Sequence, residues 1–176
     1  PIREAMRKLE SQGLIQIFPK RYAQVATFSE KEIQDIGMIR ISLDILSIKL
    51  VAINGSKAEL LNLKSIAVQC LDAFRNNDGV QRRKLDSDFH KELCRISKNN
   101  LLFNMQEDLS LKIQFILMHN DFKSVNDEQH LYQHIQIVDS LIEGNIEHAL
   151  QLDIQHLSEF YCLDIDSPIE FFLKNA

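Results

Sequence analysis

The sequence is poor in the residues that break regular structure or cross-link a secreted protein. Its 176 residues include five glycines, three prolines, three cysteines and no tryptophan. The scarcity of glycine and proline, with abundant leucine, isoleucine, lysine, glutamate and glutamine, favours helices over strands. Cys70, Cys94 and Cys162 are odd in number and widely spaced. This pattern argues against a disulfide framework or a cysteine zinc site, and predicts reduced thiols in the core.

Long apolar runs and a signal sequence are also missing. No stretch approaches the roughly 18 apolar residues of a membrane-spanning helix, and the N-terminus lacks a charged segment followed by an apolar one. The sequence therefore predicts a soluble protein of the cytoplasm. With 45% hydrophobic residues, the chain can form one well-packed domain of about 150 residues plus a fragment of another.

Charge is unevenly distributed along the chain. Residues 1–26 contain five basic and two acidic side chains, a formal charge of +3, whereas the whole chain carries −5 and the remaining residues therefore −8. The basic end is suited to contact with phosphate groups, and the acidic remainder is not. We place the domain boundary at this change, which gives domains of residues 1–26 and 27–176.

The first domain predicts a helix followed by a β-hairpin. An apolar stripe runs through residues 2–9, and Gly13 marks the end of the helix. Two short alternating segments follow, residues 14–18 and 22–26, joined by the basic turn 19–21. A helix followed by such a hairpin is typical of the second half of a winged helix-turn-helix.

From Ser29 onward the sequence predicts a succession of amphipathic helices. Ser29 with Glu32 three residues later has the pattern of a helix start. Apolar residues then recur at helical spacing in six segments that end near residues 52, 77, 97, 119, 143 and 163, the fifth beginning near residue 127. We therefore predict an all-α domain, a six-helix antiparallel bundle, with a short tail that begins at Ser167 and Pro168.

Four polar residues on three of these helices are candidates for a metal site. Asp86 and His90 are four residues apart, so they project from one face of the third helix. His134 in the fifth helix and His156 in the sixth both lie on apolar stripes. Imidazole nitrogens and carboxylate oxygens are ligands for divalent transition metals. A single histidine on an apolar face is more often a hydrogen-bonded core residue, so the residues alone leave both interpretations open.

Nearby titratable residues fit the pattern less well. Asp88 does not lie one turn before His90, so we do not expect it to be a ligand. His130 precedes His134 by four residues, but it falls beside Gln129 and off the apolar stripe. We expect His130 to be exposed, and likewise His148 near the start of the sixth helix.

Residues 1–26 resemble the recognition helix and wing of the GntR family of bacterial transcription regulators. In that family a Pro-(Val/Ile)-Arg-Glu-Ala-Leu helix leads into Leu-Glu-x-x-Gly-Leu and a Pro-x-Arg-Gly wing, which residues 1–6, 9–14 and 19–22 resemble here. Tyr22 replaces the wing glycine, and the family's preceding helices are absent from the sequence, so a partial winged helix-turn-helix is expected. The DNA-contacting residues that the resemblance implies are Arg3, Arg7, Lys8, Lys20 and Arg21.

The six helices resemble the FCD ligand-binding domain of the FadR branch of GntR regulators, and their number matches the VanR-like subgroup. The resemblance rests on Asp-x-x-x-His in the third helix and one histidine in each of the last two, with Gln133 where the family has glutamate. It implies a divalent transition metal, with zinc first and nickel, manganese or iron as alternatives. The implied ligands are Asp86, His90, His134 and His156.

The same resemblance implies a small carboxylate effector, bound by the metal and by a cationic side chain. Arg40 matches an arginine of the family, and Lys112 lies in the fourth helix where relatives often have arginine. A plainer explanation of Arg40 is an ion pair with Asp44, four residues later in the same helix.

Together the two resemblances imply a homodimeric, ligand-responsive transcription regulator that binds a palindromic operator. The alternatives are a metal-dependent enzyme in a helical scaffold and a dimerisation domain with a purely structural metal. The sequence has no HExxH-type motif and no second pair of carboxylates for a di-metal centre. We therefore expect no catalytic residues.

Overall fold

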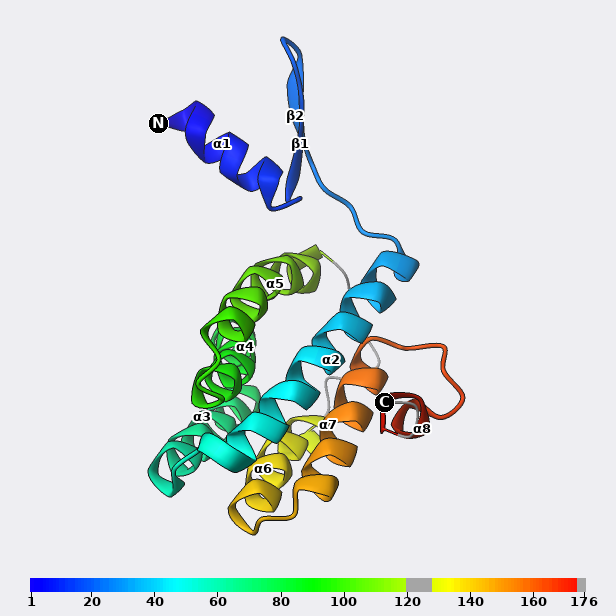
Figure 1. Cartoon of the computed structure of the whole chain (residues 1–176). Helices are drawn as coiled ribbons and strands as arrows, with labels where there is room; N and C mark the ends of the chain where they lie inside the picture. Colours follow the sequence, from blue (N-terminus) through cyan, green and yellow to red (C-terminus); the bar gives the residue numbers. More distant parts are fainter. Residues whose placement is uncertain (120–127, 174–176) are drawn as a thin grey trace.

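The computed structural model describes residues 1–119 and 128–173, and the side chains of all of these except 118 and 119 (Figure 1). The elements in chain order are α1 (Ile2–Ser11), β1 (Ile15–Phe18), β2 (Tyr22–Val25), α2 (Glu30–Asn54), α3 (Lys57–Arg75), α4 (Gly79–Ile96), α5 (Asn100–His119), α6 (Glu128–Ile142), α7 (Ile146–Phe160) and α8 (Pro168–Leu173). The prediction of a helix and hairpin before a helical bundle is confirmed. Residue 127, where the fifth helix was predicted to begin, lies outside the described residues.

Helix α1 and the hairpin project together from one end of the bundle (Figure 1). In the hairpin, Ile15 pairs with Val25 and Phe18 with Tyr22 in antiparallel register. The Glu10 carboxylate accepts a hydrogen bond of 3.0 Å from the backbone N–H of Ile17, which ties the helix to the first strand.

The helices of the bundle begin at side-chain caps that the sequence supplies. Ser29 and Glu32 form a capping box at the start of α2, and Ser56 and Glu59 form a second at the start of α3. In each, the serine hydroxyl and the glutamate carboxylate satisfy backbone N–H groups that would otherwise have no partner. Asp78 caps α4 by accepting a hydrogen bond from the N–H of Gln81.

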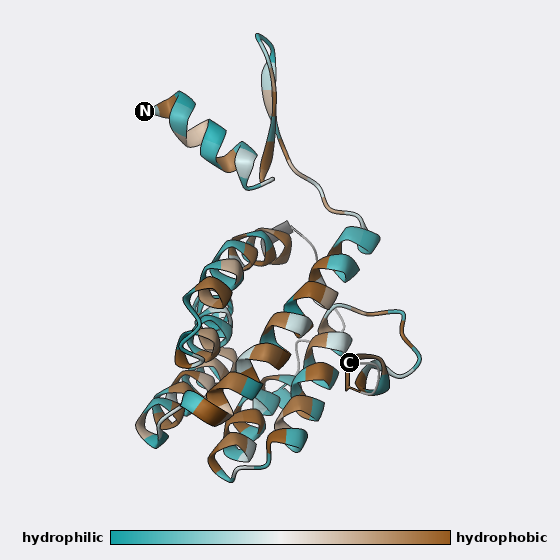
Figure 2. Cartoon of the chain, in the orientation of Figure 1, coloured by the Kyte–Doolittle hydropathy of each residue, from teal (hydrophilic) through white to brown (hydrophobic). Residues whose placement is uncertain are grey.

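The bundle is built around α2, which packs against α4, α5 and α7, while α3 packs against α4 and α6. Apolar residues lie mainly on the inward faces of these helices (Figure 2). The segment after Ser167, predicted as a tail, forms the short helix α8 beside α7. Within the described ranges, none of the helices combines the length and apolar character that crossing a membrane would need.

The core contains an unusual number of buried polar side chains. Each of the following is at most 2% exposed: Arg40, Asp44, His90, Gln106, His134, Asp153 and His156. Burying polar groups is costly unless they find partners, so their concentration in one bundle points to a site.

Candidate metal centre

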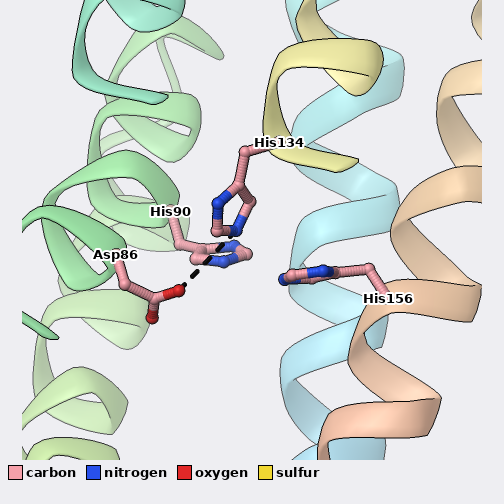
Figure 3. A group of neighbouring side chains, drawn as sticks. All are labelled: Asp86, His90, His134 and His156. Atoms are coloured by element: carbon pink, nitrogen blue, oxygen red, sulfur yellow. Dashed lines mark ion pairs between the residues drawn. The ribbon is translucent and has the colours of Figure 1, made fainter. Parts of the chain in front are cut away.

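Three helices bring Asp86, His90, His134 and His156 together. Asp86 and His90 project from one face of α4, His134 comes from α6 and His156 from α7 (Figure 3). One ligand atom from each of the four lies within 4.8 Å of the other three. The three imidazoles are buried, and Asp86 is partly buried.

Hydrogen bonds fix which ring nitrogen of two histidines faces the centre. Nδ1 of His90 donates to Oδ2 of Asp44 over 2.6 Å, and Nδ1 of His156 donates to Oε1 of Gln133 over 3.0 Å. Because each oxygen can only accept a hydrogen bond, the proton of each ring is on Nδ1 and the free lone pair of the neutral ring is on Nε2. An oxygen acceptor behind a metal-binding histidine is the usual way that proteins orient such a ligand.

Within the described part of the chain, three buried nitrogen atoms of the cluster have no hydrogen-bond partner. They are Nε2 of His90 and both ring nitrogens of His134, and Nε2 of His134 lies 3.7 Å from Oδ1 of Asp86. A buried polar atom without a partner costs about 1–3 kcal/mol. A single cation between these side chains would bind Nε2 of His90 and one ring nitrogen of His134 together with the other two donors, so the donor set fits a divalent transition metal.

The protonation states of the cluster also suit a metal. Burial lowers the pKa of His134 to about 3, although Asp86 acts in the opposite direction. Burial, reinforced by His134 and His130, holds the pKa of His156 well below its usual range. Burial opposes the charge of Asp86, but His134, His90 and Arg40 outweigh this and lower its pKa. His134 and His156 are thus neutral and Asp86 is ionised near neutral pH, as metal binding requires.

Lowering the pH is expected to destabilise the metal-free chain between about pH 6.5 and pH 4. The unfolded chain protonates His134 and His156 in this range, whereas the folded chain keeps both neutral. Each histidine contributes a slope of up to about 1.4 kcal/mol per pH unit. Burial raises the pKa of Asp153, so this carboxyl acts in the opposite direction and makes the net slope shallower. Urea denaturation with a chelator at about pH 7, 6 and 5 measures the effect, and a free energy of unfolding that stays constant or rises on acidification would contradict it.

Arg40 lies in the core beside this cluster. It is 2% exposed, and its Nη1 donates to the hydroxyl oxygen of Tyr161 over 3.1 Å. Burial opposes its charge, but Tyr161, Asp44 and Asp86 outweigh that effect and raise the pKa of Arg40. A Cβ at Gly37 would lie 2.5 Å from Cγ of Tyr161, so glycine at this position makes room for the tyrosine ring.

Lys112, the second cation implicated by the resemblance, lies elsewhere. It lines a surface groove between α2 and α5 together with Ile39, Leu43, Met105, Asp108 and Leu109. Its ammonium end extends toward Gly13, just after α1, where a Cβ would lie 3.6 Å from Nζ. Arg40 and Lys112 are therefore not brought together in one site.

The structure adds residues that sequence reasoning missed. Asp44, considered only as an ion-pair partner of Arg40, is fully buried and accepts the His90 hydrogen bond. Asp153, also fully buried, forms a second cluster with Asp44 and His90. Its place three residues before His156, on the same face of α7, was the available signal.

The expectation that His130 is exposed was wrong. It is 5% exposed, and its ring stacks on that of His156 with centroids 3.8 Å apart and planes at 16°. Helix α6 packs against both α3 and α7, so its buried face is wider than a single apolar stripe. His148 is exposed, as expected.

The basic residues of the N-terminal segment remain at the surface. Arg3, Arg7 and Lys8 are exposed on α1, and Lys20 and Arg21 are exposed at the turn of the hairpin. Lys20 adopts a left-handed backbone with φ of 60°.

Comparisons with known proteins show which family the chain resembles in sequence and in fold. The family model of the FCD domain matches residues 35–159. The chain is 29% identical over 159 residues to the HTH-type transcriptional regulator YdhC of Bacillus subtilis, covering 90% of this chain and 71% of YdhC. It is 26% identical over 163 residues to the HTH-type transcriptional repressor RspR of Escherichia coli, with the same coverage.

Solved structures share the fold. E. coli McbR/YncC superposes with a TM-score of 0.78 at 18% identity, covering 90% of this chain and 76% of that one. A GntR transcriptional regulator from Rhodococcus sp. RHA1 superposes with a TM-score of 0.74 at 17% identity, covering 92% and 77%. With the FCD model matching most of its length, this chain belongs to the FCD family of GntR-type transcription regulators.

Proposed function

We propose that the helical domain is a sensor that binds a divalent transition metal and a small organic acid, and that its occupancy controls operator binding by a homodimer in the cytoplasm. One observation carries the proposal. Ligand atoms of Asp86, His90, His134 and His156 lie within 4.8 Å of one another, and buried ring nitrogens among them have no partner.

In this proposal the four side chains hold the metal, and Asp44 and Gln133 orient two of the imidazoles from behind. Zinc is the first expectation, with nickel, manganese or iron accepting the same donors. Once bound, the metal supplies a Lewis-acid position for a ligand oxygen. Three neutral imidazoles and one carboxylate leave the centre with a net positive charge, which favours an anionic ligand.

Arg40 is the side chain that we assign to the effector carboxylate. It is a buried guanidinium close enough to Asp86 and Asp44 to interact with both electrostatically. A guanidinium can hold a carboxylate by two parallel N–H donors. The hydroxyl of Tyr161 accepts a hydrogen bond from Nη1 of Arg40 and so fixes the position of one end of the guanidinium.

Helix α1 and the hairpin are the parts that we assign to operator DNA. Arg3 is placed to reach bases, Arg7 and Lys8 to contact phosphate, and Lys20 and Arg21 to act in the wing. In a homodimer, the two helical domains would set the distance between the two DNA-binding segments. A change in that distance would alter the affinity for a palindromic operator.

Elemental analysis followed by a thermal-shift screen of small carboxylates tests the proposal. The purified chain is expected to contain about one transition metal per chain, and some carboxylates are expected to raise its melting temperature. Chelation should abolish the carboxylate response while the helical circular dichroism remains. Global unfolding on chelation would assign the metal a structural role, and a chain with neither metal nor carboxylate response would refute the sensor.

A further inference from the structure

His130 is a buried histidine that the proposed metal centre does not use. It lies one turn before His134 on α6, and its ligand atoms are not among the four that gather within 4.8 Å. Its imidazole is instead nearly parallel to that of His156, with centroids 3.8 Å apart. The ring of Phe160 continues the stack on α7, with its centroid 6.0 Å from that of His130 and planes at 18°.

The orientation of His156 needs two restraints. Its hydrogen bond to Oε1 of Gln133 holds Nδ1, but the ring can still tilt about that contact. A flat ring stacked at van der Waals distance removes this remaining freedom, because tilting would drive the two rings into each other. The proposed ligand His134 also has an aromatic neighbour. Its ring centroid lies 4.4 Å from that of Phe89, and the two ring planes are tilted by 37°.

One face of α6 supplies both restraints on His156. His130, Gln133 and His134 follow the spacing i, i+3, i+4, so they project from the same side of α6. Helix α6 therefore contributes one proposed ligand, His134. It also holds a second proposed ligand, His156 of α7, by the hydrogen bond that Gln133 accepts and by the stacked ring of His130.

We infer that His130 is a positioning residue that holds the His156 imidazole in the plane needed for metal binding. The inference rests on the metal site proposed above. It assigns the role to the flat face of the His130 ring and not to its nitrogen atoms. Phenylalanine, which has a similar flat face and no nitrogen, should therefore replace it.

Titration of the purified chain with Co²⁺, followed by visible absorption, tests this role. His130→Ala is expected to weaken Co²⁺ binding by roughly 10- to 100-fold, as loss of an outer-shell contact does in other metal sites. It should also change the shape of the d–d absorption band, because the His156 nitrogen is no longer held in place. His130→Phe should restore both the affinity, to within a few fold, and the band. His148→Ala, at an exposed histidine of α7, is the matched control and should leave both unchanged.

Two results would overturn the inference alone: binding by His130→Ala equal to that of the unsubstituted chain, or binding by His130→Phe as weak as that of His130→Ala. The second would mean that a ring nitrogen is required. If His130→Ala does not fold, His130→Leu replaces it, because leucine fills the space without a flat ring and should show the same loss. Failure of the unsubstituted chain to bind Co²⁺ would overturn the proposed metal site together with the inference.

Discussion

Replacing His134 by alanine is expected to lower the affinity of the chain for zinc by more than roughly 100-fold, since losing even an outer-shell partner costs about 10- to 100-fold. The residue lies at the centre of the cluster, fully buried, with both ring nitrogens unpartnered. Among the described residues the ring of His134 makes no hydrogen bond, so in the metal-free chain the substitution removes packing contacts, such as that with Phe89. The loss of zinc affinity appears only when metal is present.

Thermal unfolding with and without zinc separates these contributions. At a zinc concentration about 1,000 times the dissociation constant, the unsubstituted chain should gain about 4 kcal/mol of stability, and the His134→Ala chain at the same concentration less than about 1.5 kcal/mol. His148→Ala, at an exposed position of α7, should behave like the unsubstituted chain. Zinc stabilisation of His134→Ala equal to that of the unsubstituted chain would remove His134 from the site.

Replacing Arg40 by glutamine is expected to abolish the response to small carboxylates while metal binding remains. Truncating one member of a buried charge pair costs roughly 2–5 kcal/mol, which corresponds to at least a 30-fold loss of carboxylate affinity. The substitution should also lower the free energy of unfolding, because the charge of Arg40 balances those of Asp44 and Asp86. Calorimetric titration of the metal-loaded variant with a carboxylate that stabilises the unsubstituted chain gives the affinity directly.

Lys112→Gln is the matched control for this experiment. Lys112 was the other candidate cation, and it lies in the groove between α2 and α5 instead of the core. Its substitution should change carboxylate affinity little. Loss of affinity in Lys112→Gln with normal affinity in Arg40→Gln would move the effector site to that groove.

The fold was predictable because local and tertiary preferences agree. Capping serines at 29 and 56 start α2 and α3, Gly55 follows the end of α2, and Gly144 lies between α6 and α7. The four proposed ligands were also identifiable. Two are spaced one turn apart on α4, and two are histidines on apolar stripes, where an imidazole needs a partner.

The residues behind the proposed ligands were harder to predict because their roles depend on how helices pack. From the sequence, Asp44 was considered only as an ion-pair partner of Arg40, four residues earlier. The crossing of α2 and α4 also brings its carboxylate to His90. His130 was assigned to the surface from its neighbour Gln129, but contact with α7 buries it. Periodicity identifies the main inward stripe of a helix, but it identifies neither the extra face that a second neighbouring helix buries nor the partners of a residue on other helices.

X-ray absorption at the metal edge of the zinc-loaded chain identifies the atoms that bind the metal. With Asp86, His90, His134 and His156 as ligands, we expect an inner shell of imidazole nitrogens and carboxylate oxygen at about 2.0–2.2 Å, with the outer-ring scattering of three histidines. The His134→Ala chain should lose one imidazole from this pattern. A spectrum of oxygen neighbours alone, without imidazole scattering, would contradict the account.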